Sequence, residues 1–133
     1  MQTRQLISIG VLALSSGVAM AGLVQSMPVA VTANADGSGT ARGNMASARS
    51  SPNDVEYIGC GIRRHDDGAG GATASGFCQA SDAAGVTGFC SSGNMALLDA
   101  IQGIADYSYV TFSWDSKGQC QFIGISTQSF YIP

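Results

Sequence analysis

Four cysteines placed after an export signal constrain the fold of this chain more than any other feature of its sequence. The signal is predicted over residues 1–21, where Arg4 precedes an uncharged apolar run and Ala19-Met20-Ala21 forms the cleavage site. The apolar run is too short for a membrane anchor, so we expect no membrane span after cleavage. Because thiols form disulfides in the periplasm and outside the cell, we expect a periplasmic or extracellular protein with two disulfides among Cys60, Cys78, Cys90 and Cys120.

Four cysteines allow three pairings, and the turn chemistry favours one of them. Asp82-Ala83-Ala84-Gly85 lies between two strand-like runs and predicts a type I turn followed by a left-handed glycine. This turn places Cys78 opposite Cys90, close enough for a disulfide. We therefore predict Cys78–Cys90, which leaves Cys60–Cys120 by elimination.

The composition favours strands over helices. Lys and Glu, common formers of surface helices, occur once each, as Lys117 and Glu56. One convincing amphipathic helix is expected over residues 94–105, where the apolar side chains form a single stripe. We predict an α+β fold, an antiparallel sheet of about five or six strands in meander hairpins with this one helix and two disulfides.

The chain is expected to hold one disulfide-braced α+β domain over residues 43–133, preceded by an N-terminal extension or edge strand over 22–42. Residues 28–35 alternate and form the candidate edge strand, and 43–51 suit one or two helical turns. A glycine-rich loop is expected over 64–72. The remaining strands are expected at 55–63, 73–81, 86–91, 108–114 and 119–126.

The last hairpin carries a second D-x-x-G turn, Asp115-Ser116-Lys117-Gly118. Its register places Trp114 opposite Cys120 and Phe112 opposite Phe122, so that the large apolar groups share one face. The same register pairs Thr111 with Ile123 on the other face.

That other face of the last hairpin is the candidate binding face. Mixed tyrosine, hydroxyl and amide groups suit recognition of a protein or a glycan. The alternative is that the single helix packs there and both faces are buried. The residues of the candidate face are Tyr107, Tyr109, Thr111, Ser113 and Gln121.

Catalytic and metal chemistry are disfavoured, and we expect no catalytic residue, metal or cofactor. His65 is the only histidine, and no nucleophile motif accompanies it. The cysteines lack the C-x-x-C spacing of zinc sites. Asp54 with Glu56, and Asp66 with Asp67, are carboxylate pairs better explained by turns than by acid–base catalysis. The segment 34–39 echoes a calcium loop, without the glutamate that would complete it.

The charge pattern argues against nucleic acid as a partner. The chain carries a net charge of −3, and binding to phosphates requires clustered Lys and Arg. The basic cluster Arg63-Arg64-His65 is followed at once by Asp66-Asp67, which compensates it.

Several segments resemble small exported, cysteine-containing bacterial proteins of uncharacterised function. They include Tyr57-Ile58-Gly59-Cys60, Cys78-Gln79-Ala80-Ser81-Asp82 and the F-x-W-D-x-x-G-x-C run from Phe112 to Cys120. The likeness covers roughly residues 43–131. It implies a bacterial origin and a signal peptide, and it brings no activity or substrate with it.

Together these features predict a non-enzymatic binding or interaction domain, in the periplasm or outside the cell, whose partner is an unknown protein or glycan. The alternative is a structural subunit of a surface layer, matrix or fibre, since an exposed strand edge permits self-association. A small secreted hydrolase is the least favoured class.

Overall fold

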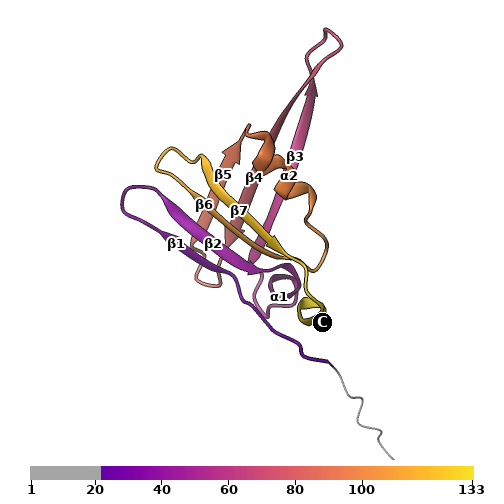
Figure 1. Cartoon of the computed structure of the whole chain (residues 1–133). Helices are drawn as coiled ribbons and strands as arrows, with labels where there is room; N and C mark the ends of the chain where they lie inside the picture. The colour runs from indigo at the N-terminus through magenta and orange to yellow at the C-terminus, as the bar shows by residue number, and fades with distance from the viewer. Residues whose placement is uncertain (1–21) are drawn as a thin grey trace, which may run out of the picture.

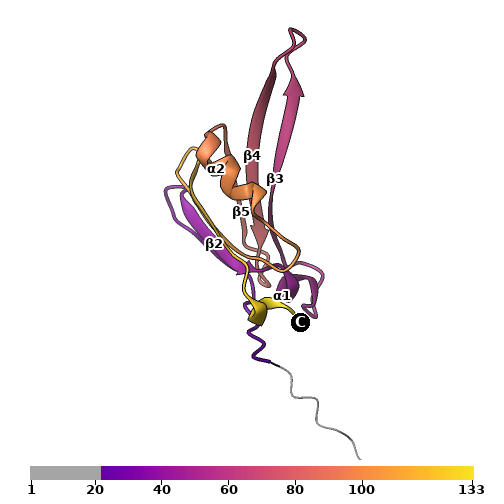
Figure 2. The same ribbon diagram turned by 45° about the vertical axis from the view of Figure 1, so that its right-hand side comes forward.

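The computed structural model describes residues 22–133, and the predicted signal peptide lies outside them. These residues form two antiparallel sheets that pack as two layers (Figures 1 and 2). The larger sheet has the strand order β1-β2-β6-β7 and the smaller β3-β4-β5. The elements are β1 (Ala30–Ala33), β2 (Gly39–Asn44), α1 (Met45–Arg49), β3 (Tyr57–Asp66), β4 (Ala72–Ser81), β5 (Thr87–Ser92), α2 (Met95–Gln102), β6 (Tyr109–Trp114), β7 (Cys120–Ser126) and the 3-10 turn η1 (Ser129–Tyr131).

The structure confirms the predicted α+β class, the antiparallel strands and the presence of two disulfides. It differs from the prediction in the number of strands and sheets. Residues 22–133 form seven strands in two sheets, where one sheet of five or six strands was expected. They also form two α-helices. Helix α2 lies where the amphipathic helix was predicted, and the short α1 lies within 43–51, where one or two helical turns were expected.

The core lies between the two sheets and is lined by the alternate side chains of each strand. Phe112 and Val110 of β6 are fully buried, as are Cys78 and Ala80 of β4. Helix α2 joins the same core, because Ile101 belongs to the same cluster of packed apolar residues.

Strand β2 was not predicted from the sequence because its inward positions hold small residues. A β-carbon added to Gly39 would collide with the ring of Trp114, and one added to Gly43 would approach Val29. These glycines therefore make room for large neighbours, which removes the alternation of large apolar groups that marks a strand. Because β2 pairs with β6, the predicted domain boundary at 42/43 falls inside an integral strand.

Both helices begin at a side-chain cap. The Oδ1 atom of Asn44 accepts a hydrogen bond from the N–H of Ser47 at 2.9 Å. Asn94 does the same for Ala96 at 2.9 Å. These caps satisfy backbone donors that a helix start leaves unpaired, and α2 lies within the range predicted for the amphipathic helix.

The two predicted D-x-x-G turns are confirmed. Gly85 has φ +79° and Gly118 has φ +74°, conformations that favour glycine. Asp82 accepts hydrogen bonds from two backbone N–H groups of its turn, and Asp115 does likewise. Asp67 repeats the arrangement at the tip of the β3–β4 hairpin.

The disulfides join Cys60 to Cys78 and Cys90 to Cys120, so the predicted pairing of Cys78 with Cys90 and of Cys60 with Cys120 is wrong. The hairpin register itself is confirmed, because Cys78 lies opposite Cys90. However, Cys78 is on the central strand and also lies opposite Cys60. The residue after Cys90 forms a bridge with the residue before Cys120. This bridge brings Cys120 next to Cys90. Cys60 is two strands, or about 10 Å, from Cys90, so Cys120 bonds to Cys90 and not to Cys60.

The register of the last hairpin is also corrected. Trp114 keeps its predicted partner at the start of β7, but a β-bulge at Gln121 shifts the following pairs by one residue. Phe112 therefore lies opposite Ile123 and not Phe122. The shift buries Ile123 and turns Phe122 outward, 53% exposed.

The β3–β4 hairpin is longer than predicted. Residues 64–66 and Ala72 belong to its strands, so the expected loop at 64–72 shrinks to a tip at 67–71. The hairpin extends well beyond the rest of the molecule in both views (Figures 1 and 2). We call its distal part, residues 63–75, the arm.

Candidate functional site

The candidate site is the side of the four-stranded sheet that points away from the core, here called the outer face. Strand alternation places one residue in two on it. Its members are Ala30, Thr32, Thr40, Arg42, Tyr109, Thr111, Ser113, Phe122, Gly124 and Ser126.

Helix α2 does not cover the outer face. Its Leu98 and Ile101 side chains lie over Gly76 of β4, on the core side of the smaller sheet. Figures 1 and 2 agree in placing α2 beside β4. The alternative interpretation, in which the helix buries the tyrosine and hydroxyl face, is therefore wrong.

Short polar side chains and one arginine form the middle of the outer face. Arg42 lies opposite Thr111, and Thr40 lies between Thr32 and Ser113 in adjacent strands. The Arg42, Thr40 and Thr32 side chains are exposed. Together with Thr111 they line a shallow depression of about 390 Å³. The depression therefore presents hydroxyl groups around one guanidinium.

Aromatic rings flank this polar strip. The Phe122 ring lies across Gly124, where an added β-carbon would be 2.8 Å from it. The Tyr109 ring stacks on Tyr131 of the C-terminal tail, with centroids 5.7 Å apart and planes at 16°. The tail thus covers part of the Tyr109 end, whereas Phe122 stays open.

The structure brings three of the five predicted site residues together, namely Tyr109, Thr111 and Ser113. Their partners differ from the predicted ones because of the bulge, and Thr111 lies opposite Gly124. Tyr107 precedes β6 and is 44% exposed.

Gln121 occupies the bulge and is engaged by the neighbouring turn. Its Nε2 atom donates to Asp115 Oδ2 at 3.0 Å. Sequence reasoning missed Arg42 and Thr40. The alternation of polar Thr40 and Arg42 with small Gly39, Ala41 and Gly43 was the available signal.

The three-stranded sheet also has an exposed side, which carries a row of aromatic and cationic groups. The Arg63 guanidinium lies 4.7 Å from the Phe77 ring centroid. Phe77 stacks on Phe89 at 6.4 Å, and Phe89 is 55% exposed. Sequence reasoning missed this row, although Phe77 and Phe89 alternate with the inward cysteines on their strands.

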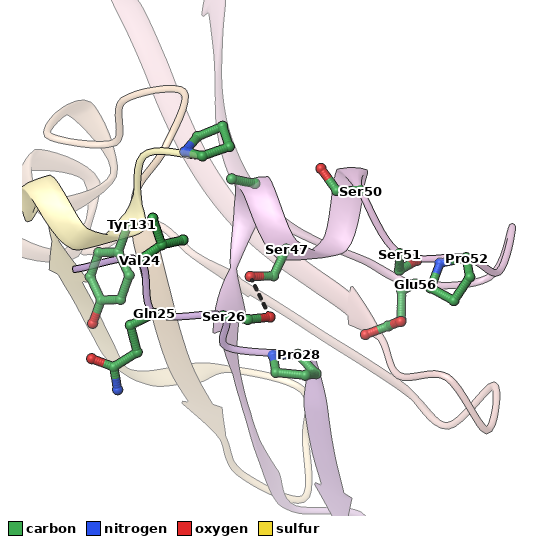
Figure 3. A pocket seen from close by; sticks show the side chains of 12 residues that line it. Val24, Gln25, Ser26, Pro28, Ser47, Ser50, Ser51, Pro52, Glu56 and Tyr131 are labelled. Carbon is green, nitrogen blue, oxygen red and sulfur yellow. Dashed lines mark hydrogen bonds between the residues drawn. The ribbon is translucent and has the colours of Figure 1, made fainter. Parts of the chain in front are cut away.

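A pocket of about 320 Å³ lies between the N-terminal segment, α1 and the C-terminal tail (Figure 3). Two of its polar side chains, Ser47 and Glu56, are engaged within the chain. Ser47 Oγ accepts from the N–H of Met27 at 3.0 Å. Glu56 accepts from the N–H of Val29 at 3.1 Å and from Asn53 Nδ2 at 2.7 Å. These bonds fasten the N-terminal segment, so the pocket is best explained as a structural junction.

Aspartate side chains in the turns accept hydrogen bonds from nearby backbone N–H groups. Hydrogen bonds from the N–H groups of Ala69 and Gly71 hold the pKa of Asp67 below its ordinary value of 3.8. Hydrogen bonds from the hydroxyl and N–H of Ser38 lower the pKa of Asp36 in the same way. This use of Asp36 fits a turn within the calcium-like segment.

His65 lies on the exposed arm opposite Thr73, in a strand and not in the expected loop. Within residues 22–133, no group of three or more His, Cys, Asp or Glu side chains is placed to hold a metal ion. No helix in that part of the chain is long and apolar enough to cross a membrane.

The chain matches no protein-family model, no curated protein and no solved structure.

Proposed function

We propose that this protein is an exported, non-enzymatic binding domain that recognises an acidic glycan through its outer face. The observation that carries the proposal is the uncovered hydroxyl strip around Arg42, flanked by the open Phe122 ring. Sugars present hydroxyl groups and apolar ring faces, and these match hydroxyl side chains and an aromatic surface.

The arginine indicates the class of glycan. A guanidinium binds a carboxylate through two parallel, charge-assisted hydrogen bonds. Arg42 projects from the middle of the sheet, between Ala30 and Thr111, where a bound sugar carboxylate could meet it. A uronic acid unit supplies such a carboxylate together with the ring face that stacks on Phe122.

The setting is the periplasm or exterior of a bacterial cell. The two disulfides support an oxidising environment. The predicted signal peptide and the resemblance to exported bacterial proteins support the location. The shallow depression suits an extended polymer, which can contact a flat sheet over several units.

The test is binding of the exported protein to immobilised acidic and neutral polysaccharides at low and moderate salt. Arg42→Ala should abolish the preference for acidic polymers, and Phe122→Ala should weaken binding to both by about tenfold, as loss of one stacking aromatic does. Phe89→Ala is the matched control, because its ring is similarly exposed, 55% against 53%, on the other sheet. Equal binding by Arg42→Ala and the unaltered chain would contradict the proposal.

A further inference from the structure

Within the part of the chain that the structure describes, the arm is an exposed two-stranded ribbon with no third strand beside it. Every residue from Arg63 to Thr73 is exposed, and the arm stands clear of both sheets (Figures 1 and 2). Isolated two-stranded ribbons are marginally stable in water. The arm therefore presents a long strand edge that another strand can complete.

The ladder of hydrogen bonds fixes which residues face that free edge. The N–H of Asp67 donates to the carbonyl of Gly71 at 3.1 Å, in the register that pairs His65 with Thr73. Antiparallel pairs alternate between bonded and non-bonded. Odd-numbered residues of β3 therefore bond to β4, and Ile62, Arg64 and Asp66 turn their N–H and C=O groups to the free edge.

We propose that this edge pairs antiparallel with the same edge of a second copy of the chain, about a two-fold axis at His65. In this register Arg64 lies opposite Asp66 of the second copy, and Arg63 lies opposite its Asp67. The sequence Arg-Arg-His-Asp-Asp is thus complementary to itself when reversed. Opposite charges directly across a strand pair are stabilising.

Charge and backbone geometry select the same register. Bonding across the free edge requires even residues to lie opposite even residues, and Arg64 opposite Asp66 meets this condition. The two nearest registers that also meet it place Arg64 opposite Arg64, or Asp66 opposite Asp66. Like charges directly opposite are destabilising, so both neighbours are disfavoured.

The shape of the molecule permits this contact. Because the second strand runs antiparallel, the two bodies lie at opposite ends of the paired arms. The contact involves only a few residues of each chain, far below the area of a stable dimer. Pairing is therefore expected to be weak, dependent on concentration and reduced by salt.

The test is sedimentation equilibrium of the exported protein and of three arm variants at low salt. Arg64→Asp and Asp66→Arg each create two like-charge pairs in the dimer and should lower the association constant about tenfold. The double variant Arg64→Asp/Asp66→Arg restores every opposite-charge pair but lacks the hydrogen bond that Asp66 Oδ1 accepts from the Gly68 N–H at 2.7 Å. It should therefore associate more strongly than either single variant. An equimolar mixture of the two single variants should form heterodimers, because opposite charges again face each other across the pair.

A second readout tests the register without relying on charge. In the paired state the N–H groups of Arg64 and Asp66 become protected from hydrogen exchange as the protein concentration rises. The N–H of His65 already bonds to β4 and should change little. Circular dichroism and an intact count of two disulfides verify that each variant is folded. A chain that stays monomeric at millimolar concentration, or a double variant as weak as the single ones, would overturn the proposal.

Discussion

The indole ring of Trp114 lies so close to Gly88 that a β-carbon at this glycine would come within 2.5 Å of it. Trp114 belongs to the larger sheet and Gly88 to the smaller one. The same ring also presses on Gly39, and its Nε1 atom donates to the carbonyl of Gly37 at 3.0 Å. Trp114 therefore sets the separation of the two sheets, and Gly88 and Gly39 leave the space that its ring occupies.

Gly88→Ala is expected to destabilise the protein because the new methyl group must displace the buried indole. Overpacking of this kind costs about 1–3 kcal/mol. Gly59→Ala is the matched control, since it lies in a strand with nothing within 4 Å of the added β-carbon. Urea unfolding should show a lower midpoint for Gly88→Ala alone. Equal losses in both variants would mean that the effect is one of strand backbone and not of packing.

The two disulfides are expected to differ in their contribution to stability. Cys90–Cys120 joins the two sheets with a sequence separation of 30, whereas Cys60–Cys78 joins neighbouring strands with a separation of 18. Chain entropy assigns about 3–4 kcal/mol to each bond. Losing Cys90–Cys120 also removes the disulfide that links the two sheets, which then rely on non-covalent packing.

Thermal unfolding of two double variants measures this difference. Cys90→Ser/Cys120→Ser should melt at a lower temperature than Cys60→Ser/Cys78→Ser, whose strands stay paired along the ladder. The reverse order would show that the β3–β4 hairpin needs its covalent bond more than the sheets need theirs.

The incorrect prediction of the disulfide pairing shows which features of this fold can be predicted from the sequence and which cannot. The turn at Asp82 correctly set Cys78 opposite Cys90, because turn chemistry is local. Whether Cys78 bonds to Cys60 or to Cys90 depends on which strand packs next to each of these two cysteines. That is a property of how the two sheets pack, and no local pattern records it.

The outer face illustrates the same limit. Alternation in β6 correctly placed Tyr109, Thr111 and Ser113 on one face. The bulge at Gln121 was not predicted, and it exchanges which residues of β7 face the core and which face outward. Arg42 was missed because β2 is built from small residues that accommodate Trp114 and Val29. The only sequence signal for such a strand is the alternation of small with polar residues, and the packing then explains why the small residues face inward.

Acid is expected to loosen the tip of the arm. The hydrogen bonds from Ala69 and Gly71 hold the pKa of Asp67 below its ordinary value of 3.8. A lowered pKa means that the bonds are fully present above the ordinary value and are lost as the pH falls through the lower, folded one. The amide resonances of Ala69 and Gly71 should therefore titrate together below pH 3.8. Asp67→Ala should remove that titration, and its persistence would assign it to another carboxylate.

The two proposals make a joint prediction about binding to surfaces. A weak pair of arms places two outer faces in one particle, and two linked sites bind a multivalent surface far more tightly than one. Arg64→Asp should therefore reduce retention on a densely coated acidic polysaccharide and leave binding to a short soluble fragment unchanged. Arg42→Ala should reduce both. Surface plasmon resonance at high and low ligand density separates the two effects. Loss of fragment binding in Arg64→Asp would place the arm within the binding site, whereas unchanged retention at high density would argue that the protein binds as a monomer.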